Sequence, residues 1–396
     1  MRYTMKKRHV FLFLLAALLL HAADMVAGKG LSRAESDKVR AQVIGDWMER
    51  TRTEFGPMFL DGQAEGLSIA NGDNRMPIWF AVYGDAPAGD RSLWISLHGG
   101  GGTTQEVNDG QWDNQKRLYR PAEGVYVAPR APVNAWDMWC QAPIDVLYEK
   151  LIKAMVACQG VNPDKVYLMG YSAGGDGVWR MAPRMADRWA AASMMAGHPG
   201  DVSLLNLRNL PFMIWCGEND AAYNRNKLCA ERGLQMDSLE RDCPGGYRHE
   251  THIMEGKGHW MDREDRAALP WMQQFVRNPY PHQIVWQQEE VLRSQFYWLE
   301  VPRDEMVRGR QVRLSVEGNI IDIARCDYEH LTLYLCDELV NLDKPVTVRL
   351  DGRRVFKGRV PRREDVMRQT VDERGDPRYC FPAKVEISGR KAAVAD

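Results

Sequence analysis

The chain has 396 residues, a formal net charge of −1, 45% hydrophobic residues and 27% charged residues. These values exclude a disordered, collagen-like or multi-span membrane chain, and the length predicts two globular units with a short appendage. Because lysines and arginines are spread along the chain instead of forming a block or stripe, the sequence gives no support for a nucleic-acid partner.

The N-terminal segment has the order of a secretory signal peptide. Basic residues precede an apolar run over residues 10–20, and small residues follow at Ala22, Ala23 and Ala27. The run is shorter than the roughly 20 residues that a membrane-spanning helix needs. We therefore expect residues 1–27 to be a signal peptide, contact with the membrane through this segment alone, and an exported, periplasmic or secreted protein.

From about residue 76, short β-rich runs alternate with helical stretches, as in a parallel sheet covered by helices. The clearest helix covers residues 143–159, with Gly160 just past its end. A run at residues 78–83 and the next strand are expected to form an antiparallel entry into the sheet. Continuous apolar runs, typical of strands buried on both faces, cover residues 93–97, 125–128, 166–169 and 212–216. The sequence thus predicts an α/β fold with a doubly wound, mostly parallel sheet.

The alternation stops near residues 278–281, where two prolines indicate a domain boundary. We expect one domain over residues 28–282 and a smaller β-rich, sandwich-like domain over residues 283–396. A helix is expected around residues 363–371. Strand-like runs cover residues 296–299, 312–316, 320–324, 331–335, 346–350 and 355–360.

Ser172 lies between Gly170 and Gly174, directly after the predicted strand at residues 166–169 and before a helical stretch. A nucleophile elbow turns so sharply from strand to helix that only small residues fit beside the serine. Such a turn exposes the hydroxyl and places the N–H of Ala173 where an oxyanion would form. The pattern therefore indicates a serine nucleophile, although on its own it is as consistent with a glycine-rich loop.

A second glycine-rich segment, residues 99–102, follows His98 at the end of an upstream strand. Without side chains this backbone can approach a substrate carbonyl and direct an N–H at it. Gly100 is the first candidate oxyanion donor and Gly101 the second, whereas His98 is expected to stabilise the loop. No lysine follows as in a phosphate-binding loop, and the glycine spacing does not fit a dinucleotide site.

A serine hydroxyl needs a base to take its proton and a carboxylate to orient that base. The strand at residues 212–216 is followed by Glu218 and Asp220, and we favour Asp220 as the acid with Glu218 as the alternative. His259 lies in a glycine-flanked loop after the next strand-like run and is the predicted base. The chain order Ser172, Asp220, His259 is then complete.

Aromatic residues adjoin these loops and are candidates for the substrate pocket. Trp136 and Trp139 follow an upstream strand, and Tyr223 and Trp260 flank the acid and base. Core packing is an equally good interpretation, because tryptophan is usually well buried.

The remaining histidines and the eight cysteines predict neither a metal site nor a cofactor. His249 and His252 form only a weak pair on a strand. Export would permit disulfides, and Cys229 with Cys243 is the preferred pair, whereas Cys216 lies in a predicted buried strand and is expected to be a free thiol.

Together these segments resemble the α/β-hydrolase superfamily over about residues 60–280. The three loops are similar to those of secreted esterases related to dienelactone hydrolases, polyhydroxybutyrate depolymerases and the catalytic domain of prolyl oligopeptidase-type peptidases. The resemblance implies ester or peptide hydrolysis through an acyl-enzyme, with these roles at Ser172, Asp220 and His259. There is no room for the propeller of prolyl oligopeptidases, and residues 198–209 are too short for a large lid.

The leading hypothesis is an exported hydrolase of small or polymer-derived carboxylic esters, without a cofactor. One alternative is a serine peptidase acting on small peptides. Another is a non-catalytic binding or scaffold protein that uses the hydrolase fold, because a fold alone does not establish a catalytic function. The sequence leaves the oligomeric state and the role of the C-terminal β region open.

Overall fold

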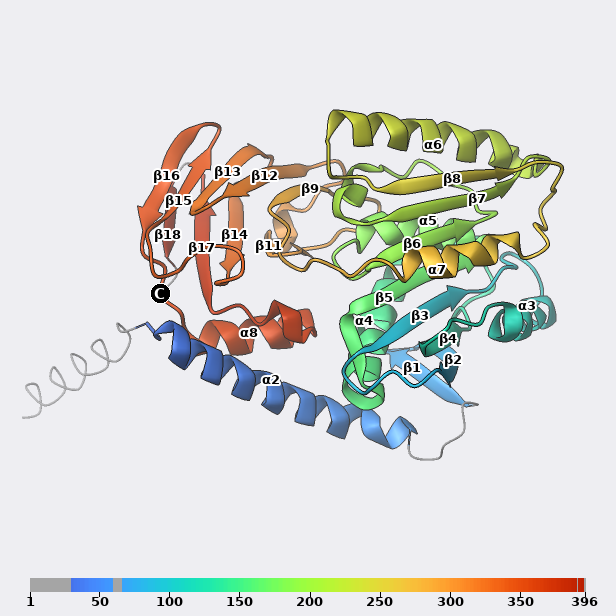
Figure 1. The fold of residues 1–396 in the computed structure, drawn as a ribbon, viewed down its shortest axis with the longest axis horizontal. Coiled ribbons are helices and arrows are strands. Elements are labelled where there is room, and N and C mark those ends of the chain that lie inside the picture. The colour runs from blue at the N-terminus through green and yellow to red at the C-terminus, as the bar shows by residue number, and fades with distance from the viewer. Residues whose placement is uncertain (1–29, 60–65, 390, 395–396) are drawn as a thin grey trace, which may run out of the picture.

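The computed structural model describes residues 30–59, 66–389 and 391–394, so the predicted signal peptide lies outside the described residues. One eight-stranded sheet and two five-stranded sheets make up the β structure (Figure 1). The large sheet occupies one end of the molecule, the two smaller sheets occupy the other, and a long N-terminal helix runs along both.

The eight-stranded sheet has the order β1-β2-β4-β3-β5-β6-β7-β8 and is parallel from β4 through β8. The expected antiparallel entry is present, but β2 pairs with β4 and not with β3, the next strand in the chain. The predicted α/β fold is therefore confirmed, with one changed neighbour. Its strands are β1 (Leu67–Asn71), β2 (Asn74–Tyr83), β3 (Arg91–Leu97), β4 (Gly124–Pro129), β5 (Val161–Tyr171), β6 (Ala191–Met195), β7 (Phe212–Gly217) and β8 (His249–Met254).

Helices cover both faces of this sheet, as a doubly wound sheet requires. Successive residues of β3 point to opposite faces: Leu93 packs in the same buried cluster as α4, α5 and α6, and Trp94 packs in the cluster of α7. Helix α4 begins with a proline in its first turn and ends at Gly160, whose φ of 66° suits glycine. The helices that pack against this sheet are α3 (Gln105–Leu118), α4 (Ala142–Gln159), α5 (Ala173–Arg184), α6 (Arg225–Asp242) and α7 (Ala268–Met272).

The C-terminal β region begins with β9, directly after the predicted boundary at residue 282. Its sheets have the orders β16-β15-β13-β12-β9 and β10-β11-β14-β17-β18, and their apolar side chains share one buried cluster, as in the expected sandwich. Its strands are β9 (Gln283–Gln287), β10 (Gln295–Phe296), β11 (Leu299–Glu300), β12 (Gln311–Glu317), β13 (Ile320–Cys326), β14 (His330–Leu335), β15 (Val346–Leu350), β16 (Arg353–Gly358), β17 (Ala383–Ser388) and β18 (Lys391–Val394).

One predicted strand of this region is wrong. Residues 296–299 do not form a continuous strand, because the chain reverses between β10 and β11 and pairs Phe296 with Leu299. Tyr297 has a φ of 52°, a left-handed conformation that an extended strand excludes. The expected helix is present as α8 (Glu364–Arg374). Short 3₁₀ helices are η1 (Gly56–Phe59), η2 (Leu205–Asn209), η3 (Ala222–Asn224), η4 (Glu264–Ala267), η5 (Arg303–Glu305) and η6 (Pro377–Tyr379).

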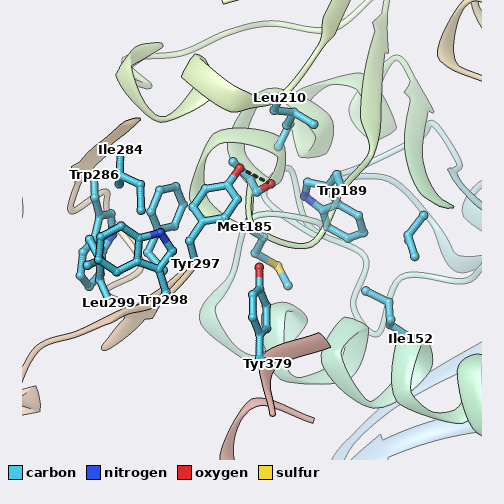
Figure 2. Packing of buried hydrophobic residues seen from close by; sticks show 14 of the residues in the cluster. Ile152, Met185, Trp189, Leu210, Ile284, Trp286, Tyr297, Trp298, Leu299 and Tyr379 are labelled. Carbon is cyan, nitrogen blue, oxygen red and sulfur yellow. Dashed lines mark hydrogen bonds between the residues drawn. The ribbon is translucent and has the colours of Figure 1, made fainter. Parts of the chain in front are cut away.

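The reversal at Tyr297 attaches the C-terminal β region to the large α/β unit. Figure 2 shows Tyr297 beside Met185, with Trp189 beyond them and Tyr379 approaching from η6. The hydroxyl of Tyr297 donates to the carbonyl of Ala186 at 3.1 Å. The buried apolar cluster is continuous across this junction, so the two parts of the chain share one core.

The junction also contains buried ion pairs. Arg374 pairs with Asp187 at 2.9 Å, and Asp376 pairs with Arg277 at 2.8 Å and with Arg188 at 3.2 Å. All five side chains are almost fully buried. Buried charges are tolerated when each is paired and hydrogen-bonded, and removal of one partner is costly.

A helix that the sequence analysis did not predict, α2 (Arg33–Phe55), begins with a reciprocal cap in which Ser32 and Glu35 each accept the other's backbone N–H. It buries Val43 and Trp47 and contacts both α4 and α8. None of the helices in the described ranges has the length and apolarity of a membrane span.

All eight cysteines are free, so the preferred Cys229–Cys243 disulfide is absent. Cys229 is buried on α6, whereas Cys243 caps the end of the same helix. A separation of 14 residues corresponds to about 21 Å along a helix, far beyond the reach of a disulfide. Cys216 is a buried free thiol, as expected.

Candidate active site

Ser172 occupies a sharp turn between β5 and α5, with φ 58° and ψ −121°. Glycine is required on both sides. A Cβ on Gly170 would lie 2.4 Å from the carbonyl oxygen of Gly174, and a Cβ on Gly174 would lie 2.2 Å from that of Leu97. The strained serine and its close neighbours are the features of a nucleophile elbow, and they explain why the turn has a Gly-x-Ser-x-Gly sequence.

The structure brings together the three residues that the sequence analysis selected. The Oγ atom of Ser172 lies 2.9 Å from Nε2 of His259, and Nδ1 of His259 lies 2.8 Å from Oδ2 of Asp220. Asp220 is 2% exposed, whereas the His259 side chain is 44% exposed. Glu218, the alternative acid, instead accepts the N–H of Gly256 at 2.9 Å. A hydrogen-bonded chain therefore runs from a buried carboxylate to a hydroxyl at the surface.

The acid and base loops are packed directly on each other. Asn219, beside the acid, donates its N–H to the carbonyl of Lys257 at 2.8 Å. Gly217 ends β7 beneath the base loop, and a Cβ there would lie 2.0 Å from the carbonyl oxygen of Gly258. The absence of a side chain at Gly217 thus allows the two loops to approach each other.

Two residues that the sequence analysis missed hold this chain in place. Arg225, at the start of α6, contacts Oδ1 of Asp220 at 3.3 Å, leaving Oδ2 for His259. Tyr171 donates its hydroxyl to the carbonyl of His259 at 2.6 Å and accepts the N–H of Met261 at 3.2 Å. Neither role has a sequence signal, because each depends on which loops meet in space.

The glycine run after β3 is held by His98 and Asn108. His98 is buried, and burial lowers its pKa to about 4, so the ring is neutral at physiological pH. Its Nδ1 lies 2.6 Å from the carbonyl of Gly99, and its Nε2 accepts the N–H of Ala131 at 3.1 Å. His98 therefore stabilises the loop, as expected. Asn108, on α3, was not predicted.

The candidate oxyanion donors differ in whether their backbone N–H is already hydrogen-bonded within the protein. The N–H of Gly101 donates to Oδ1 of Asn108 at 2.9 Å, so the expectation that Gly101 could serve as the second donor does not agree with this geometry. Gly100 has a φ of 107° and no hydrogen bond from its N–H within the ranges that the structure describes. Ala173 is the first residue of α5, where no carbonyl of the helix can accept its N–H.

Of the four predicted pocket aromatics, Trp260 lines the cleft beside Ser172, Trp136 and Tyr223 lie at the glycine run, and the fourth lies elsewhere. Trp136, Tyr223 and Trp260 are 64%, 64% and 49% exposed. Trp136 covers the glycine run and meets the Tyr223 ring edge-on at 6.4 Å. Trp139 is fully buried and donates its indole N–H to the carbonyl of His98 at 3.0 Å, so the prediction that it lines the pocket is wrong.

A cleft of about 790 Å³ opens beside Ser172 and is lined by Gly99, Gly100, Tyr171, His259 and Trp260, together with residues of α3. It has room for a small molecule or the end of a chain. Across the described ranges, no group of three or more His, Cys, Asp or Glu side chains is arranged to hold a metal ion.

No family model and no curated protein matches this sequence. Among solved structures, the chain is similar to a thermostable esterase, with 16% identity and a TM-score of 0.44. The match covers 53% of this chain and 62% of the esterase, so it spans less than two thirds of the esterase's length. It is also similar to a ferulic acid esterase, with 15% identity, a TM-score of 0.38 and coverage of 52% and 95%. A third similar structure is Est1E from Butyrivibrio proteoclasticus, with 13% identity, a TM-score of 0.35 and coverage of 53% and 96%.

Proposed function

We propose that this chain is a serine hydrolase that cleaves carboxylic esters, with Ser172 as its nucleophile. The observation that carries the proposal is the continuous hydrogen-bonded chain from Ser172 through His259 to the buried Asp220. A hydroxyl bonded to an imidazole, itself bonded to a carboxylate, is the arrangement that activates serine for attack on a carbonyl. The strained turn at Ser172 and the open cleft beside it support the same function.

In the proposed reaction, Nε2 of His259 takes the proton of Ser172 as Oγ attacks the ester carbonyl. Asp220 accepts the Nδ1–H bond and stabilises the imidazolium. The tetrahedral oxyanion is bound by the N–H groups of Gly100 and Ala173. His259 then protonates the departing alkoxide and leaves an acyl-enzyme. Water attacks the acyl carbon, gives its proton to His259 and releases the carboxylic acid as the Ser172 hydroxyl is restored.

The test is hydrolysis of p-nitrophenyl acetate and butyrate by the wild type and by Ser172→Ala. We expect kcat/KM to fall by about a thousandfold or more, because the nucleophile is lost. Ser238→Ala, on the exposed side of α6, is the matched control and should keep wild-type activity. Wild-type rates in Ser172→Ala would show that the nucleophile is assigned wrongly.

A fluorophosphonate probe separates the hydrolase from a binding protein that merely has this fold. The proposal expects labelling of the wild type at Ser172 and none of Ser172→Ala. If the folded wild type remains unlabelled, the scaffold alternative is correct. A p-nitroanilide with the same acyl group tests the peptidase alternative, and we expect turnover of the ester to exceed that of the anilide.

We also propose that the protein is exported. The proposal is supported by residues 2–27, in which basic residues are followed by an apolar run and then by small residues. N-terminal sequencing of the protein recovered outside the cytoplasm should find cleavage near residue 27. An intact N-terminus on cytoplasmic protein would contradict it.

A further inference from the structure

The cleft beside Ser172 has one wall made by a single face of α3. Val107, Gln111, Asn114 and Leu118 recur at three- and four-residue spacing, so they follow one another along this helix. The start of the wall adjoins the reaction centre, since a Cβ on the neighbouring Gly99 would lie 3.7 Å from Oε1 of Gln111. The far end lies toward the C-terminus of α3.

Arginines collect at that far end. Arg117 and Arg263 line the cleft and also a second pocket of about 460 Å³, which is further lined by Arg120 and Arg266. We call these four residues the cleft arginines. Two pockets with shared lining residues adjoin each other, so an arginine-rich pocket lies directly beside the cleft. Among the residues that the structure describes, no aspartate or glutamate lines either pocket.

Three carboxylates close in sequence to Arg117 and Arg263 are paired with lysines. Lys116 pairs with Asp113 at 2.7 Å, and Lys257 pairs with both Asp262 and Glu264 at 2.8 Å. Within the part of the chain that the structure describes, the cleft arginines have no ion-pair partner. Four cations with no carboxylate in a concave site produce a positive field that attracts and binds anions.

The spacing along α3 sets where a bound anion would lie. Arg117 is six residues beyond Gln111, which corresponds to about 9 Å along the helix axis. Arg263 follows the proposed base by four residues and lines the same two pockets from a different segment of the chain. A guanidinium group matches the oxygens of a carboxylate, which arginine binds in a bidentate manner.

We propose that the cleft arginines bind a carboxylate of the substrate, so that the esters cleaved at Ser172 carry a second, ionised acid group. This inference rests on the hydrolase function proposed above and adds the class of substrate. Arg117 and Arg263 are its principal ligands. Gln111 and Asn114 offer amide groups to the part of the substrate between the ester and the carboxylate.

The probes are mono-p-nitrophenyl esters of dicarboxylic acids with four to ten carbons, each compared with the neutral methyl ester of the same acid. The wild type should prefer the charged ester, most strongly at the chain length that spans the cleft. In the double variant Arg117→Gln, Arg263→Gln, the ratio of kcat/KM for charged to neutral ester should fall at least about tenfold. The preference should also weaken as sodium chloride is raised.

Lys116→Gln is the matched control, because it removes a neighbouring cation that already has a partner. It should retain the wild-type preference. Equal turnover of charged and neutral esters by the wild type would overturn the proposal, as would a preference that survives in the double variant.

Binding of a dicarboxylic acid, measured without turnover, tests the carboxylate site independently of the hydrolase function. Calorimetric titration of Ser172→Ala with the free dicarboxylic acid should show binding that the two added arginine substitutions abolish. If the wild type hydrolyses no ester but this binding is seen, the hydrolase proposal fails and the carboxylate site stands. If neutral esters are hydrolysed and no dicarboxylate binds, the carboxylate site is refuted alone.

Discussion

Two arginines line the cleft beside Ser172 and two more line the adjoining pocket, whereas four others lie where the C-terminal β region meets the α/β unit. The second set, which we call the junction arginines, is fully balanced by carboxylates. Arg188, Arg277, Arg293 and Arg374 pair with Asp145, Glu149, Asp164, Asp187 and Asp376. The cleft arginines have none of these partners and face open pockets. Arginines with carboxylates hold the fold together, whereas those without are available to a ligand.

The pKa values of buried carboxyl groups also differ between the junction and the arginine-rich pocket. Burial would raise the pKa of Asp187 and of Asp376, but the surrounding junction arginines outweigh it and lower both values. Beneath the arginine-rich pocket, burial raises the pKa of Asp265 to about 6, and the hydrogen bond from Tyr119 offsets this only in part. No arginine contributes to the pKa of Asp265.

The largest expected effect is at the junction. Arg277→Met removes a buried cation that binds Asp164 and Asp376 and also donates to the carbonyl of Asp187. We expect the free energy of unfolding to fall by about 3–5 kcal/mol, because breaking a buried pair leaves an uncompensated charge. Urea denaturation followed by circular dichroism measures it. A loss below about 1 kcal/mol would mean that the junction arginines do not hold the fold together.

Asp265→Asn should change how stability depends on pH. A pKa raised from 3.8 to about 6 means that the folded state holds a proton that the unfolded state has lost, so wild-type stability declines as pH rises between these values. The total is about 3 kcal/mol. The melting temperature of Asp265→Asn relative to wild type should therefore increase from pH 4 to pH 8.

Tyr119→Phe is the companion variant. It removes the hydrogen bond that lowers the pKa of Asp265, so the decline of stability should be larger than in the wild type and should extend to higher pH. If the melting temperatures of the three proteins changed by the same amount from pH 4 to pH 8, the raised pKa of Asp265 would be contradicted.

Arg225 is an intermediate case, since it has one carboxylate partner and adjoins the proposed catalytic residues. If the hydrolase proposal holds, Arg225→Met should lower kcat about tenfold with little change in KM, because Asp220 loses the hydrogen bond that orients it. Arg225→Lys should restore part of the rate. An unchanged kcat in Arg225→Met would show that His259 alone positions the carboxylate.

The smallest expected effect is at a cleft arginine. Arg266→Met removes no ion pair seen in the described residues, so the free energy of unfolding should stay within about 0.5 kcal/mol of wild type. The measurement is the same urea titration used for Arg277→Met. If Arg266→Met lost as much free energy of unfolding as Arg277→Met, the cleft arginines would contribute to stability as the junction arginines do, and the distinction between them would be wrong.

Much of the α/β unit and the central residues of the site could be predicted because their signals are local. The elbow at Ser172 requires small neighbours for steric reasons, Asp220 follows a strand whose apolar run is visible in the sequence, and His259 follows the next strand along the chain. Parallel strands place such loops at one edge of a sheet, so chain order was enough to bring the three residues together.

The rest depends on contacts between distant segments. Trp139 and Trp136 are three residues apart and equally apolar, yet only packing decides that one is buried and the other exposed. Tyr297 takes a left-handed conformation in a turn that has no glycine or asparagine to signal it. The cleft arginines come from two segments far apart in the chain, and their lack of carboxylates is visible only in three dimensions.

Helix α2 has a consequence for the order in which the chain can fold. The ribosome completes this helix before it makes α8, one of the surfaces on which the helix rests, and more than three hundred residues separate the two. Leu31 likewise bonds to the carbonyl of Arg362 at 2.9 Å, across more than three hundred residues. Such distant contacts close only after α8 has been made, so α2 should reach its native position after the α/β unit has been synthesised, and deletion of α8 should loosen α2.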